Sequence, residues 1–97
     1  MEQRANAKCD YTVNLDTYIY GVDDMGTTDT VTAYFYSFWG SYLGKTSKSE
    51  IGSSFWYEWD ETFKYSSCDE QVAHFELEIS GENALLIGEV SFRKDGP

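Results

Sequence analysis

Short segments in which apolar and polar residues alternate follow one another along the chain. In residues 72–79, Phe75, Leu77 and Ile79 alternate with polar side chains, so a strand here would have one apolar and one polar face. Residues 30–38 are β-branched and aromatic throughout, which also favours a strand. The predicted strands are residues 11–20, 30–38, 45–51, 53–65, 72–79 and 84–92, the fourth either continuous or split in two at Asp60.

The connections between these strands are polar turns, and none has the pattern of a crossover helix. About seven short strands separated by such turns are typical of an antiparallel sandwich or barrel. We therefore predict an all-β fold, an antiparallel β-sandwich. The expected organisation is a flexible leader at residues 1–8, a single domain at 9–94 and a tail at 95–97.

The composition agrees with this fold and constrains the partners. Eight Tyr, six Phe and three Trp suit a half-buried pleated surface, and 97 residues suffice for one domain. Seventeen Asp and Glu against seven Lys and Arg give a net charge of −10, which argues against direct nucleic-acid binding. The acidity leaves three interpretations: a site for a hard cation, a surface for a basic protein, or plain solubility.

The order of segments resembles the PLAT domain (polycystin, lipoxygenase, alpha-toxin), a small β-sandwich. The resemblance rests on Tyr11-Thr12-Val13, on the loop and strand at residues 26–36, on Asp60-Glu61-Thr62-Phe63, and on the closing strand at 87–92. Two positions depart from the family pattern. Thr28 stands where Gly is expected, and Leu85 stands where Trp is common. The resemblance implies a binding module that recruits a lipid surface or a protein, with calcium as the candidate cofactor and a secreted or extracellular location.

Four aspartates form the candidate metal site. Asp23, Asp24 and Asp29 share one loop, and Asp60 joins them if the PLAT resemblance holds. Calcium takes six to eight oxygen ligands, which carboxylates and loop carbonyls provide. The alternative is ordinary turn chemistry, because Asp side chains bond to nearby backbone groups.

Aromatic residues form the candidate contact surface for a partner or lipid. Trp39 and Tyr42 flank a predicted turn, where burial is hard to arrange. Trp56 and Trp59 are three residues apart, so a strand would bury one and expose the other. The contact prediction is Trp39, Tyr42 and Trp56; the alternative is that these rings cover the ends of the sandwich.

Cys9 and Cys68 are the two cysteines, placed at the edges of two predicted strands. Their positions resemble those in small secreted plant PLAT proteins, which implies a disulfide. Two buried free thiols are the alternative. A bridge that closes so long a loop would stabilise the fold by about 4 kcal/mol in the chain-entropy account.

Catalysis is not expected. His74 is the single histidine, and no nucleophile, phosphate loop or zinc ligand set accompanies it. We predict that the protein is not an enzyme and that His74 is a surface residue.

A second functional interpretation is a small acidic inhibitor or immunity protein, of phage or bacterial type, that acts in a host cytoplasm. Such a protein blocks a basic site on an enzyme or a nucleic-acid-binding protein. Glu76 and Glu78 share one strand face, and further carboxylates lie near in sequence. These are Glu50, Glu58, Asp60 and Glu61.

Overall fold

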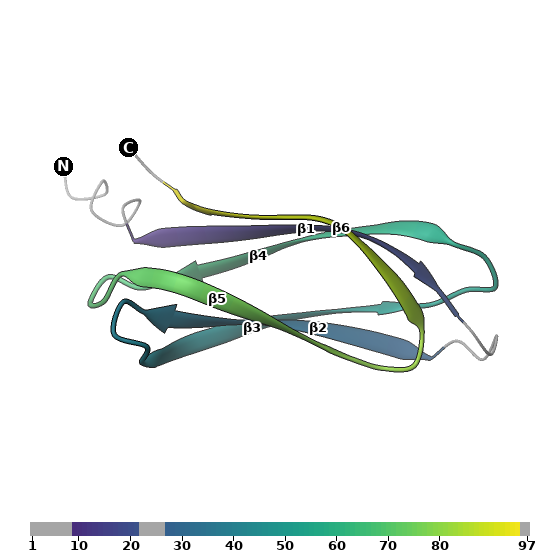
Figure 1. Ribbon diagram of the computed structural model, residues 1–97, viewed down its shortest axis with the longest axis horizontal. Helices are drawn as coiled ribbons and strands as arrows, with labels where there is room; N and C mark the ends of the chain where they lie inside the picture. Colours follow the sequence, from purple (N-terminus) through teal and green to yellow (C-terminus); the bar gives the residue numbers. More distant parts are fainter. Residues whose placement is uncertain (1–8, 22–26, 96–97) are drawn as a thin grey trace.

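The computed structural model describes residues 9–21 and 27–95, and these form an all-β fold of two three-stranded antiparallel sheets (Figure 1). One sheet has the strand order β4-β1-β6 and the other has the order β3-β2-β5. The strands are β1 (Asp10–Tyr20), β2 (Thr28–Ser37), β3 (Tyr42–Ile51), β4 (Tyr57–Ser66), β5 (Val72–Ser80) and β6 (Ala84–Lys94). The described part of the chain contains no helix long and apolar enough to cross a bilayer.

The described strands number six, and the prediction of about seven is therefore wrong in count. Asp60 does not divide β4, because its backbone pairs with Asp16 of β1 while its side chain is exposed on the outside of the sheet. β3 is longer than expected and begins at Tyr42. Its polar residues still alternate, and Thr46 and Lys48 lie opposite the buried residues Ala33 and Val31.

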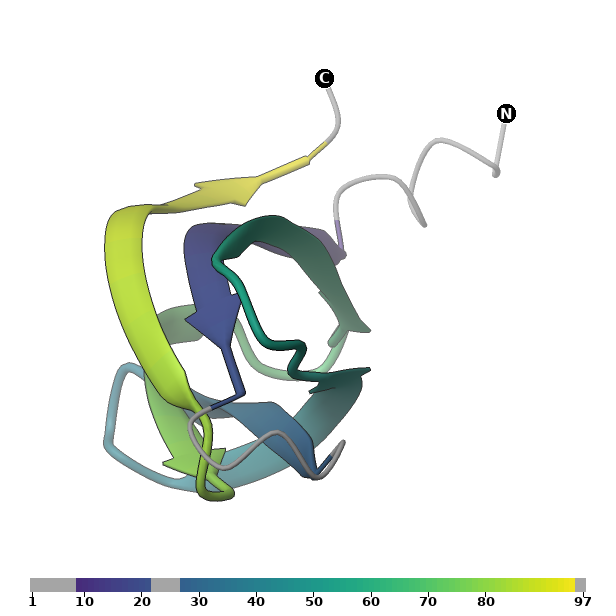
Figure 2. The same ribbon diagram turned by 90° about the vertical axis from the view of Figure 1, so that its right-hand side faces the viewer.

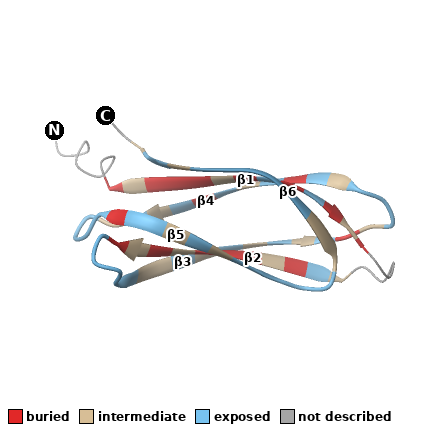
Figure 3. Ribbon diagram, in the orientation of Figure 1, coloured by how far each residue is buried: buried red, intermediate tan, exposed pale blue. Residues whose placement is uncertain are grey.

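The two sheets pack face to face around one apolar core, in a sandwich-like arrangement. The central strands β1 and β2 contribute most of it, because each is covered by a strand on both sides (Figure 3). Phe35 of β2 stacks on Tyr65 of β4 with ring centroids 5.0 Å apart, which joins the sheets. The buried cluster contains Tyr11, Val13, Leu15, Ile19, Val31, Ala33, Phe35, Trp59, Phe63 and Val72.

Hydrogen bonds from side chains close the border between β3 and β4. The Tyr65 hydroxyl donates to the Leu43 carbonyl at 2.6 Å, and the Thr46 hydroxyl donates to the Lys64 carbonyl at 2.9 Å. On the opposite border, β6 rises from the end of β5 to the sheet that contains β1 (Figure 2). The two borders of the sandwich are therefore built differently.

A disulfide between Cys9 and Cys68, 59 residues apart in sequence, ties the start of β1 to the turn after β4. The Ser67 amide also donates to the Cys9 carbonyl at 2.9 Å. The free cysteines of the alternative interpretation are therefore absent from the described residues. This bridge fixes the end of the molecule at which the β4–β5 connection lies.

Candidate partner-binding face

The outer face of the β3-β2-β5 sheet carries a cluster of tyrosines and glutamates. On β2 the buried residues Ala33 and Phe35 alternate with Tyr34 and Tyr36, which therefore point outward. On β5, Glu76 and Glu78 point to the same side, since Glu76 lies directly opposite Tyr34. We call Tyr34, Tyr36, Glu76 and Glu78 the tyrosine–glutamate face.

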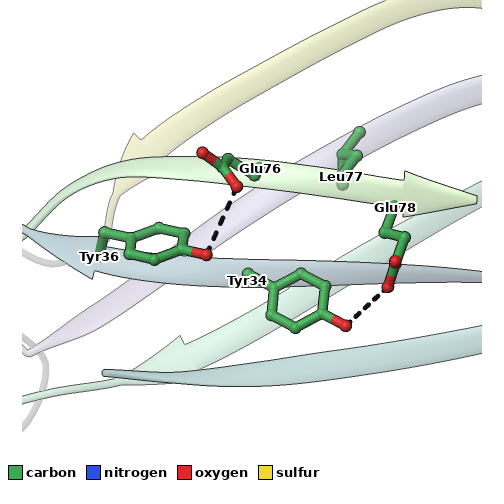
Figure 4. Close-up of a pocket in the computed structure, with 5 residues that line it drawn as sticks. All are labelled: Tyr34, Tyr36, Glu76, Leu77 and Glu78. Atoms are coloured by element: carbon green, nitrogen blue, oxygen red, sulfur yellow. Dashed lines mark hydrogen bonds between the residues drawn. The ribbon is translucent and has the colours of Figure 1, made fainter. Parts of the chain in front are cut away.

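Each tyrosine hydroxyl of this face donates a hydrogen bond to a glutamate on the neighbouring strand. Tyr34 donates to Glu78 at 2.7 Å, and Tyr36 donates to Glu76 at 3.4 Å (Figure 4). Both bonds run diagonally between β2 and β5, each to the residue two positions along β5 from the direct partner of the tyrosine. The two pairs therefore present their rings and carboxylates side by side.

Three further side chains extend the face. His74 stacks on Tyr36 with ring centroids 4.8 Å apart and planes 6° from parallel. The Tyr42 ring of β3 lies 6.0 Å from that of Tyr36, in an edge-on orientation. The Lys45 ammonium lies 6.0 Å from the Tyr34 ring centroid. Aromatic rings from three strands thus lie together on the outer face beside the two carboxylates, those of Tyr34 and Tyr36 partly exposed.

The electrostatics keep the tyrosines as hydrogen-bond donors. The hydrogen bond to Glu78, followed by desolvation, raises the pKa of Tyr34. Desolvation, followed by the charge of Glu76, raises the pKa of Tyr36. Both hydroxyls therefore stay protonated at neutral pH, and each carboxylate keeps further lone pairs for an external donor.

An open depression of about 380 Å³ lies over the tyrosine–glutamate face. Leu77 also borders it, although its side chain packs against the core. Two carboxylates beside aromatic rings match a guanidinium, which donates paired hydrogen bonds to a carboxylate from its edge and stacks on rings through its plane. Cations also favour the faces of tyrosine rings. The face therefore combines acceptor oxygens with ring surfaces, the two kinds of group that pair with guanidinium and ammonium ions.

The outer face of the β4-β1-β6 sheet is acidic in a different way. Asp60 lies directly opposite Asp16, and Glu58 lies on the same face. A hydrogen bond to Asp60 and the charge of that residue raise the pKa of Glu58. Carboxylates here meet one another across the strands, which is destabilising. Among the described residues, no three His, Cys, Asp or Glu side chains form a group that could hold a metal.

The predicted metal site is only partly within the described residues, because Asp23 and Asp24 lie outside them. The structure does not bring Asp29 and Asp60 together. Asp29 is buried at the start of β2, whereas Asp60 is exposed on the outside of the other sheet.

Asp29 has a structural role at the turn between β5 and β6. Its Oδ1 accepts a hydrogen bond from the Asn83 amide at 3.1 Å. A Cβ on Gly81, whose φ is +131°, would lie 2.0 Å from the same oxygen, so this turn requires glycine. The other carboxylate oxygen of Asp29, Oδ2, is buried without a hydrogen-bond partner among the described residues. The bond to Asn83 spans 54 residues of sequence, so Asp29 joins β2 to the β5–β6 turn, and the ordinary turn chemistry predicted for its own loop is not what the structure shows.

The predicted aromatic contacts lie at opposite ends of the molecule. Trp39 and Tyr42 are exposed at the β2–β3 turn, where the Ser37 hydroxyl accepts hydrogen bonds from the Trp39 and Ser41 amides. Trp56 is half-exposed before β4 and stacks on Tyr20 at 5.3 Å. Trp59 is buried, which confirms that one tryptophan of the second pair is in the core.

The sequence reasoning found Glu76 and Glu78 but missed Tyr34 and Tyr36. The strict alternation of Tyr34 and Tyr36 with Ala33 and Phe35 was the available signal. This alternation shows that the two tyrosines share a face, but not what lies beside them. The register of β2 against β5 brings them next to the glutamates. Glu50 and Glu61, also named from the sequence, instead accept hydrogen bonds from Tyr57 and the Trp59 indole.

Comparison of the chain with protein-family models, with curated proteins and with solved structures found no match.

Proposed function

We propose that this protein is a non-catalytic binding module that docks on a basic site of a protein partner through the tyrosine–glutamate face. The observation that carries the proposal is the pair of hydrogen bonds from Tyr34 and Tyr36 to Glu78 and Glu76. They hold two carboxylates against partly exposed rings, in positions suited to guanidinium or ammonium groups. A net charge of −10 would steer a basic partner toward the protein.

The fitting biological role is that of a small acidic inhibitor, which occupies a basic site on its target. Electrostatic docking of this kind weakens as ionic strength rises. At physiological salt concentrations, interactions between exposed charges more than about 8–10 Å apart are largely screened. The proposal needs no metal ion.

Calorimetric titration with a peptide of alternating Arg and Gly tests this proposal. The matched variants are the double substitutions Glu76→Gln with Glu78→Gln, and Glu58→Gln with Asp60→Asn. Each removes two carboxylates, from opposite outer faces, so the change in net charge is the same. We expect the first pair to weaken binding by about tenfold or more and the second by less than about threefold, with both effects shrinking in high salt. Equal losses would show that only net charge acts.

A second candidate is a PLAT-like sandwich that recruits a lipid surface, favoured by the exposure of Trp39 and its neighbour Phe38. Tryptophan at a turn suits a membrane interface. The test is sedimentation with phosphatidylserine vesicles, with and without calcium, for the wild type and Trp39→Ala. Calcium-dependent binding that Trp39→Ala abolishes would support this candidate, and no sedimentation in either condition would reject it.

A further inference from the structure

Three aliphatic side chains at the β5–β6 border face the interior of the sandwich and are nevertheless accessible. Ile79 lies opposite Val31, Ile87 opposite Thr17 and Val90 opposite Leu15, and all three partners are fully buried. The three residues themselves are exposed by 45%, 47% and 38%. We call Ile79, Ile87 and Val90 the border strip. Apolar surface of this kind is typical of a contact site when it is contiguous with an unpaired strand.

Of the two strand edges at this border, that of β5 is the better suited to pairing with an added strand. Within the described residues, β5 pairs with β2 alone and β6 with β1 alone. The pairing of β6 shifts register at Gly88, in the middle of the strand, whereas that of β5 shifts only at its start, at Ala73, and is continuous from His74 to Ser80. Bulges disrupt the edge on which they occur. The outward backbone groups of β5 are therefore the better template for an added strand.

The charge around the border strip selects the kind of strand. Residues 65–92 contain no Lys or Arg, and their acidic residues are Asp69, Glu70, Glu76, Glu78, Glu82 and Glu89. A second copy of this chain, paired β5 to β5, would bring Glu76 and Glu78 against like charges, which is destabilising across strands. An added strand with basic residues meets complementary charge instead.

We propose that β5 accepts an extended segment of the protein partner in which apolar and basic residues alternate. Its apolar side chains cover Ile79, Ile87 and Val90, and its basic side chains lie on the outer face beside Glu76 and Glu78. The period of two in a strand allows one segment to make both sets of contacts. This inference rests on the proposed function and adds to it the conformation and sequence pattern of the bound segment.

The test uses a peptide of alternating Val and Lys, with a peptide of the same composition in one Val block and one Lys block as control. Binding is measured by calorimetry, and the site is located by the amide shifts of residues 74–80. The matched variants are Ile87→Lys and Leu86→Lys, neighbours on β6 that face opposite sides. We expect Ile87→Lys to weaken binding by about tenfold, because the charge would be buried beneath the added strand, and Leu86→Lys by less than about threefold.

Ile79→Lys provides a second variant, and thermal melting checks that each variant is folded. Equal losses for Ile87→Lys and Leu86→Lys, or equal affinity for the two Val/Lys peptides, would overturn the inference. Failure of the alternating Val/Lys peptide to bind would also overturn it. The Arg-Gly peptide distinguishes this failure from that of the proposed function, because glycine has no side chain to cover the border strip. If the Arg-Gly peptide binds and the alternating Val/Lys peptide does not, the proposed function stands and the pairing of an added strand with β5 is rejected.

Discussion

The two outer faces of the molecule are both acidic, yet their carboxylates have different neighbours. On the β3-β2-β5 sheet, Glu76 and Glu78 accept hydrogen bonds from tyrosine hydroxyls. On the β4-β1-β6 sheet, Glu58 shares a hydrogen bond with Asp60, and Asp60 lies directly opposite Asp16. The two faces therefore differ in what surrounds their carboxylates: tyrosine donors and rings on one, other carboxylates on the other.

The central strand of each sheet is responsible for this difference. β2 turns Tyr34 and Tyr36 outward, whereas β1 turns Asn14 and Asp16 outward at the middle of its sheet. A central strand contacts both neighbours, so its outward residues determine the partners of the whole face.

The largest effect predicted for a single substitution concerns the rings. Tyr36→Ala removes the surface that stacks on His74 and faces the depression, and should weaken binding of the Arg-Gly peptide by roughly tenfold. The control is Tyr18→Ala, which removes a half-exposed tyrosine from the other outer face. Calorimetry of both variants provides the measurement.

Tyr36→Phe separates the ring from the hydroxyl. Since it keeps the ring, we expect it to bind within about threefold of the wild type. Equal effects of Tyr36→Ala and Tyr18→Ala would remove the distinction between the faces.

The alternation of apolar residues predicted the all-β fold, because core-facing side chains in a strand recur at every second position. The sequence could not predict that β4 continues through Asp60, since an outward aspartate and a turn aspartate look alike. It also could not predict the cluster of Tyr34 with Glu78, which are 44 residues apart and meet only through strand register. The separation of Asp29 from Asp60 was hidden for the same reason.

The second prediction compares the contributions of the two faces to stability. Glu58→Gln should raise the melting temperature at neutral pH, because it relieves repulsion by Asp60 and Asp16. Glu78→Gln should leave it unchanged or lower it slightly, because it weakens the acceptor of the Tyr34 hydroxyl. Thermal melts in low salt provide the measurement. A lower melting temperature for Glu58→Gln would contradict the account of that face.

The third prediction concerns how the contribution of the Glu58 carboxyl to the free energy of unfolding changes with pH. The pKa of Glu58 is raised in the folded state, so its charged form is destabilising above that pKa. Protonation of Glu58 should therefore raise the free energy of unfolding. This increase develops as the pH falls through the folded pKa of Glu58 toward its pKa in the unfolded chain, about 4.3. Urea melts of the wild type and Glu58→Gln between pH 7 and pH 4 measure this gain. The difference between the two proteins should narrow toward acidic pH, and a constant difference would contradict it.

The smallest effect is expected in alkaline solution. Desolvation and the hydrogen bond to Glu50 raise the pKa of Tyr57 to about 12, and the pKa values of Tyr34 and Tyr36 are also raised. The stabilisation that these tyrosines provide is complete below about pH 10 and is lost as the pH rises through their folded pKa values. Absorbance at the tyrosinate band follows the ionisation. The double variant Glu76→Gln with Glu78→Gln should ionise Tyr34 and Tyr36 at lower pH, with Tyr57 unaffected.

The most direct test of the central claim is amide and side-chain chemical-shift mapping of the isotopically labelled protein with the Arg-Gly peptide in low salt. The account predicts that the largest shifts lie at Tyr34, Tyr36, Glu76 and Glu78, and that residues around Asp16, Glu58 and Asp60 remain close to their free positions. Shifts of equal size on the two faces would contradict the claim that the tyrosine–glutamate face is the recognition site.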